Sequence, residues 1–130
     1  MLIDTSSNEL GIAVSSARFK REIRDLGKAS EALYALRPVA FRYRESEPQA
    51  AIEYGLIAEE VIEAAPDLVV YDEAGEPHAV RYQLLAPMLV NEVQKQQRTI
   101  EGQQQVIAAL TGRLDTVEQQ LAAVSADSGR

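Results

Sequence analysis

The last third of the chain carries a heptad pattern of apolar side chains. From about Leu84, apolar residues recur with alternating spacings of three and four over five heptads, which predicts a coiled-coil helix. The first core position (a) holds Ala86, Val93, Ile100, Ile107, Leu114 and Leu121, and the second (d) holds Leu89, Gln96, Gln103, Leu110, Val117 and Val124. Pro87 suits a first helical turn, so the helix is expected to begin near Leu84. The mixture of side chains leaves the number of helices in the coiled coil open.

Shorter patterns before the heptads predict a small domain of mixed elements. Residues 39–44 alternate apolar and polar side chains as a half-buried strand does, and residues 53–57 are expected to form a second strand. A short helix is expected over 58–64. Residues 68–71 and 78–82 are expected to pair as a hairpin. The fold class is therefore α+β: a small globular domain of short helices and strands, followed by a long coiled-coil helix.

Nearer the N-terminus, the pattern predicts two short helices. Ser15 or Ser16 suits the N-cap of a helix over residues 17–26, which Gly27 would stop. One apolar stripe on this helix is expected from Phe19, Ile23 and Leu26. A second helix is expected over residues 31–36, because Pro38 follows. Residues 10–14 form an apolar patch that suits a short strand.

Composition narrows the class of protein. About 70 residues remain for a globular core, which is near the lower limit, so oligomerisation is expected to add burial. The net charge of −7 argues against a general nucleic-acid binder. No apolar run approaches the ~20 residues of a membrane span. The chain has no cysteine and a single histidine, His78, so neither a disulfide nor a His-His-carboxylate metal site is expected, and no cofactor is predicted.

The candidate chemistry lies at Ser15 and Lys20, where the weakly patterned N-terminus meets the domain. A serine hydroxyl becomes a good nucleophile when a base removes its proton, and an uncharged lysine amine is such a base. Arg18 and Arg21 flank Lys20 and oppose its positive charge, and a helix start would add the same effect and free N–H groups for an oxyanion. The residues alone also fit a helix cap beside a solvated lysine, which is the usual role of a serine and a lysine at a helix start.

Two other groups of side chains are expected to have structural rather than catalytic roles. The carboxylates Glu59, Glu60 and Glu63 suit a solvated helix face rather than acid–base chemistry. Four tyrosines at strand-like positions suit core and interface packing: Tyr43, Tyr54, Tyr71 and Tyr82.

Five segments in order resemble the endosialidase-type intramolecular chaperone domain, a self-cleaving serine peptidase domain at the C-termini of phage tail spikes and fibres and of related surface proteins. They are residues 15–23, 36–43, 54–61, 65–69 and 80–85. The first segment has the order of residues found at the start of that family's domain. It runs from a serine through an arginine to a lysine five residues after the serine, and an isoleucine follows (Ser15, Arg18, Lys20 and Ile23). The family often has aspartate after the nucleophile, where this chain has Ser16.

The resemblance implies an intertwined homotrimer that registers an upstream fibre or spike domain of the same chain and then cuts itself off. It implies Ser15 as nucleophile, Lys20 as general base and Val14–Ser15 as the cleaved bond, with Ser16 and Arg18 in support. From composition, no nucleic-acid, membrane or metal partner is expected. The source would be a phage tail-fibre precursor, with the released chaperone in the host cytoplasm, or a bacterial prophage or surface protein.

The resemblance and the heptads together divide the chain into four parts. Residues 1–14 would end the delivered protein, 15–83 would form the chaperone and autoprotease domain, 84–125 the trimerisation helix, and 126–130 a disordered tail. Two alternatives remain: a trimerisation and registration module that does not cleave and uses Ser15 only as a cap, and a monomeric binding domain that uses the tyrosine-bearing strands.

Overall fold

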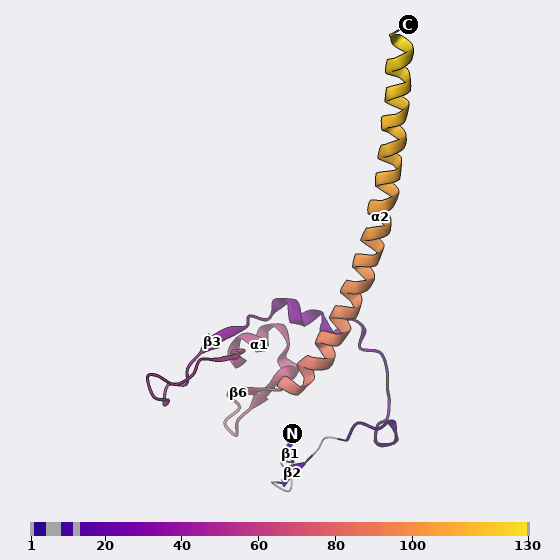
Figure 1. The fold of residues 1–130 in the computed structure, drawn as a ribbon. Coiled ribbons are helices and arrows are strands. Elements are labelled where there is room, and N and C mark those ends of the chain that lie inside the picture. Colours follow the sequence, from indigo (N-terminus) through magenta and orange to yellow (C-terminus); the bar gives the residue numbers. More distant parts are fainter. Residues whose placement is uncertain (1, 5–8, 12–13, 130) are drawn as a thin grey trace.

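The computed structural model describes residues 2–4, 9–11 and 14–129 (Figure 1). It has short helices and small antiparallel sheets at one end of a long C-terminal helix, which confirms the expected fold class. The elements in chain order are β1 (Leu2–Asp4), β2 (Glu9–Gly11), η1 (Ala17–Phe19), η2 (Gly27–Ala35), β3 (Val39–Phe41), β4 (Glu53–Gly55), α1 (Ala58–Ala64), η3 (Pro66–Leu68), β5 (Val69–Tyr71), β6 (Pro77–Val80), η4 (Tyr82–Leu84) and α2 (Leu85–Ser128), where η marks a 3-10 helix.

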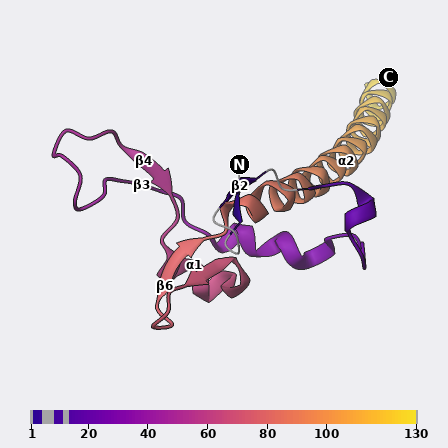
Figure 2. The same ribbon diagram turned by 90° about the horizontal axis from the view of Figure 1, so that it is seen from below.

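The strands form three separate two-stranded antiparallel sheets: β1 with β2, β3 with β4, and β5 with β6. The expected strands at residues 39–44 and 53–57 are present as β3 and β4, in shorter form. The loop between them projects from the small domain of short helices and strands that precedes α2, which we call the body (Figure 2). The expected hairpin is present as β5 and β6. β2 includes the start of the strand expected at 10–14, and residues 12–13 lie outside the described part of the chain.

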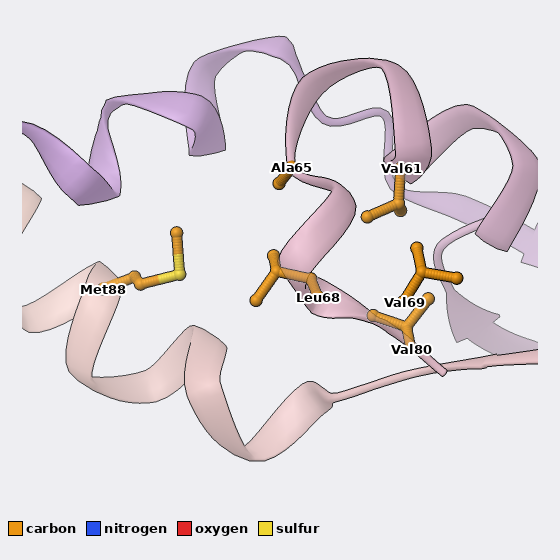
Figure 3. Packing of buried hydrophobic residues seen from close by; sticks show 6 residues of the cluster. All are labelled: Val61, Ala65, Leu68, Val69, Val80 and Met88. Atoms are coloured by element: carbon orange, nitrogen blue, oxygen red, sulfur yellow. The ribbon is translucent and has the colours of Figure 1, made fainter. Parts of the chain in front are cut away.

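A small apolar core lies where α1, η3, the β5–β6 hairpin and the start of α2 meet (Figure 3). The buried apolar side chains in the described residues are Val61, Ala65, Leu68, Val69, Val80 and Met88. None of the four tyrosines belongs to this core, because Tyr43, Tyr54, Tyr71 and Tyr82 are all exposed in the single chain, so the core part of that expectation is wrong. A core of six mostly small side chains is little burial for a domain of this size.

Gly55 allows β4 to approach η4 closely. The backbone N–H of Leu56 donates a hydrogen bond of 2.9 Å to the Tyr82 hydroxyl. A Cβ at position 55 would lie 2.7 Å from that hydroxyl oxygen, so a side chain there would displace the tyrosine. This contact ties the β3–β4 hairpin to the turn that starts α2.

The long helix α2 has two different faces. It begins at Leu85, close to the expected start, and its 44 residues extend roughly 65 Å at 1.5 Å per residue. It continues to Ser128, so residues 126–128, expected in a disordered tail, are helical. The a and d positions together form one stripe, which we call the heptad seam. Its apolar residues from Leu89 onward are exposed along the whole helix. The other face, around Met88 and Glu92, packs against the body.

A buried carboxylate joins α2 to η2, and we call this network the Glu92 clasp. Glu92 is only 5% exposed and accepts hydrogen bonds from the Ser30 hydroxyl at 2.6 Å, Lys95 Nζ at 2.8 Å and the Tyr34 hydroxyl at 2.9 Å. Asn91 Nδ2 donates to the Ser30 hydroxyl at 2.7 Å and to the Gly27 carbonyl at 2.9 Å. A buried charge with this many partners is costly to leave unpaired, so the clasp fixes η2 against the helix.

We predict that acid weakens the clasp. The hydrogen bonds from Lys95 and Ser30 lower the pKa of Glu92 from its ordinary 4.5 to about 2, against the opposing effect of burial. Because the folded-state pKa is the lower one, the ionised carboxylate stabilises the fold above the unfolded value, and this contribution is lost as the pH falls through 4.5 towards 2.

Thermal unfolding followed by circular dichroism checks this prediction. Glu92→Gln should unfold at a lower temperature than wild type at neutral pH, and the difference should shrink as the pH falls from about 5 to about 2. Glu118→Gln, at an exposed glutamate further along the same helix, serves as the control and should follow wild type. A Glu92→Gln curve parallel to wild type at every pH would contradict the prediction.

Candidate functional site

Ser15 and Lys20 are in direct contact. Lys20 Nζ lies 3.1 Å from Ser15 Oγ, a hydrogen-bond distance, and both side chains are exposed. The turn η1 produces this contact: the N–H of Phe19 donates to the Ser16 carbonyl at 3.0 Å, and that of Lys20 to the Ala17 carbonyl at 3.0 Å. This 3-10 turn reverses the chain, so the long lysine side chain reaches back to the serine.

The helix expected over residues 17–26 is wrong, because only η1 is helical and the chain then leaves the helical region. Lys20 has extended angles (φ −118°, ψ 148°), and Glu22 has a left-handed φ of 56°, which no α-helix accommodates. The expected apolar stripe has no core to pack against, because Phe19, Ile23 and Leu26 are all exposed in the single chain. Short isolated helices are marginal without such packing.

This correction changes the electrostatics of the site. A three-residue turn has little of the dipole of a full helix, so the expected help from a helix start is small. Ser16 has extended angles (φ −63°, ψ 141°) before η1, but its side chain makes no capping hydrogen bond. The Arg18 guanidinium lies 4.6 Å from the centre of the Phe19 ring, a cation–π contact.

The proposed cleavage position is accessible. The Val14 side chain is 64% exposed, and Ser15 to Phe19 are exposed as well. A surrounding polypeptide is needed before this site can exclude water, and the single chain supplies none at this point.

The other candidate residues have structural roles or lie at the surface. Glu60 is not simply solvated: its two carboxylate oxygens accept hydrogen bonds from Arg37 Nε at 3.0 Å and Nη2 at 2.5 Å. The Arg37 guanidinium lowers the pKa of this carboxyl, and Glu60 raises the pKa of Arg37. His78 is exposed on β6.

The described part of the chain offers neither a cluster of metal ligands nor a helix suited to a bilayer. In residues 2–4, 9–11 and 14–129, no three His, Cys, Asp or Glu side chains are grouped to hold a metal ion. In the same residues, no helix combines the length and apolar character needed to cross a bilayer.

Sequence reasoning missed the Glu92 clasp. Its members come from two segments about 60 residues apart, and each alone suits a solvated helix face. The available signal was weak: Glu92 and Lys95 are spaced i, i+3 outside the heptad core, and the predicted second helix has a serine just before it and a tyrosine on it.

The fold and the site together define a class: a small α+β domain with a local serine–lysine contact at its entry and a projecting heptad helix. Residues 15–70 match the family model described as "Chaperone of endosialidase". This part of the chain is therefore an endosialidase-type chaperone domain, and the resemblance inferred from the sequence is confirmed. No curated protein matches the chain.

Proposed function

We propose that this protein is a C-terminal intramolecular chaperone that trimerises, registers an upstream fibre- or spike-like domain and then releases itself by cutting the Val14–Ser15 bond. The observation that carries the proposal is the 3.1 Å contact between Lys20 Nζ and Ser15 Oγ. The family match begins at Ser15, the residue that would become the new N-terminus.

The contact supports a single-turnover acyl transfer. An uncharged Lys20 amine takes the proton of the Ser15 hydroxyl, and Oγ attacks the carbonyl carbon of Val14. The C–N bond breaks, the Ser15 nitrogen takes a proton and becomes a free α-amine, and an ester joins Val14 to Ser15 Oγ. Water then hydrolyses the ester, which leaves a carboxylate at Val14 and restores the hydroxyl. Serine and lysine suffice for these steps, without metal or cofactor.

The exposed heptad seam of α2 supports a homotrimer. Side chains from Val93 to Val124 at a and d positions are exposed in the single chain, and a seam of this length is stable only against other helices. The body packs beside the d-position edge of the seam near the start of the helix, so the rest of the seam is free to meet two further copies. The mixed a and d residues leave the number of strands open, and the endosialidase-type family resemblance supplies the expectation of three.

Assembly and cleavage fit one mechanism. Long β-rich fibres fold slowly, and a coiled coil that holds three chain ends together lowers the cost of bringing them into register. The Ser15–Lys20 pair is open to water in the single chain, and an assembled trimer is a means of covering it. Cleavage after assembly then removes the element that eased folding and leaves a kinetically stable product.

The proposal divides the chain by role. Residues 1–14 end the delivered protein, residues 15–83 form the chaperone and autoprotease domain, and the helix that follows trimerises it. The upstream domain of the same chain is the natural client, in a phage tail-fibre precursor or a bacterial surface protein. The alternative is a registration module that does not cleave, and the exposure of Ser15 and Lys20 in the single chain favours it.

We predict that the expressed chain loses about its first 14 residues and that Ser15→Ala stays full length. Lys20→Ala should slow processing roughly 10²- to 10⁴-fold, the usual contribution of a general base. Intact mass and N-terminal sequencing measure both effects, and hydroxylamine should speed release in wild type because it attacks the ester. Lys28→Ala, which removes an exposed lysine from η2, is the control and should be processed as wild type. Processing of Ser15→Ala at the wild-type rate would exclude the dyad.

We predict that the seam controls both assembly and cutting. Ile107→Asp places a charge in an a layer and should convert the trimer to smaller species and slow processing by about tenfold or more. Ala109→Asp, two residues further on the outer side of the helix, is the matched control and should stay trimeric. Light scattering measures the mass of the assembly, and the intact mass of the chains in the same samples measures processing. Normal processing by a monomeric Ile107→Asp chain would separate cleavage from assembly and contradict the mechanism.

A further inference from the structure

An apolar groove of about 330 Å³ lies beside the start of α2. Its walls come from η2 and the residues after it, from β4, and from the first turns of α2. They include Leu33, Leu36, Pro38, Tyr54, Leu85 and Leu89. Tyr54 is 84% exposed, so much of this apolar lining faces water in the single chain.

The groove opens on one edge of the heptad seam. Leu89 occupies a d position and Leu85 the g position before it, and both line the groove. The buried positions of α2, Met88 and Glu92, lie further round the same side of the helix, where the body packs. The opposite edge of the seam, which carries the e positions, is uncovered, and Val90 there is 57% exposed.

We propose that the groove is filled by Val90 of a neighbouring copy of this chain. The inference rests on the parallel trimer of the proposed function and deepens it. In a parallel coiled coil, the g position of one helix lies beside the following e position of its neighbour. That pairing sets Leu85 of one copy against Val90 of the next, at the level of the groove.

The composition of the e positions singles out the same residue. From Leu85 to Ser128 the e positions hold Val90, Gln97, Gln104, Thr111, Glu118 and Ser125. Val90 is the one apolar side chain in this set, and it falls at the level of the groove.

A second candidate occupant is the exposed arm after the serine–lysine pair, which carries Ile23. Its side chain is 68% exposed and lines a different hollow, formed by residues of its own arm. Heptad register ties Val90 to the level of the groove, and nothing comparable ties Ile23 to it. The geometry therefore favours Val90.

Cross-linking tests the assignment on a clean background, because the chain has no cysteine. The double variant Leu36→Cys/Val90→Cys is treated with a short bis-maleimide, and the covalent species are resolved under denaturing conditions. We expect the monomer band to be lost to covalent dimers and trimers, while each single variant stays monomeric on the gel. Leu36→Cys/Gln97→Cys, one heptad further along, is the matched control and should give little cross-linking. Tyr54→Cys/Val90→Cys repeats the test from the exposed wall if Leu36→Cys fails to fold.

Light scattering before cross-linking measures the oligomeric mass, so a failure of the trimer can be told apart from a failure of the groove assignment. Each outcome then decides the proposal. A trimer that cross-links through Leu36→Cys/Ile23→Cys and not through Val90→Cys overturns the assignment in favour of the arm. A trimer with no link from either groove position to Val90→Cys overturns it outright. A monomeric mass overturns both the trimer and the groove assignment. A dimer that links through Val90→Cys keeps the groove assignment and overturns the trimer.

Discussion

Glu92 brings an ionised carboxylate to 5% exposure between η2 and α2, where a hydroxyl, an ammonium group and a phenol donate to it. Such a charge tolerates few alternative arrangements, because a rotation of the helix would separate it from the Ser30 and Tyr34 hydroxyls of η2. The clasp therefore fixes which side of α2 the body covers. The e-position edge of the heptad seam is left free as a consequence, and the groove beside Leu85 and Leu89 lies along the edge that the body adjoins.

The small core makes the clasp more important. Six buried apolar residues leave much of the apolar surface of the body uncovered, including Tyr54 and Ile23. A domain of this size gains limited stability from its own burial, so the folded state of a single chain is marginal. Under the proposed function, folding and association are linked by mass action, and the assembled form is more stable than the single chain.

The elements with strong periodicity were predictable from the sequence. The α2 heptads, α1 and the β5–β6 hairpin combine a clear period with turn or helix-stop residues, so pattern alone located them. The segment after Ser16 has a helical stripe as well, but a stripe forms a helix only where it meets a core, and Ile23 meets none in this chain. The Glu92 clasp was beyond sequence reasoning, because its partners meet only through tertiary packing. The contact of Ser15 with Lys20 followed from spacing as a possibility, and a 3-10 turn, rather than the expected helix, supplies it.

The turn η1 also determines how early the Ser15–Lys20 contact forms relative to chain association. Ser15 and Lys20 are joined by four intervening residues, so their contact has almost no loop to close and forms within about a microsecond of the segment's release, by the usual rates of local chain closure. Under the proposed function, association of three chains is far slower and depends on concentration. The pair is therefore already together when copies meet, and again after every unsuccessful encounter. In this scheme the slow step is the exclusion of water from a Ser15–Lys20 pair that is already in contact. Misassembled copies can therefore separate and associate again while the Val14–Ser15 bond is still intact.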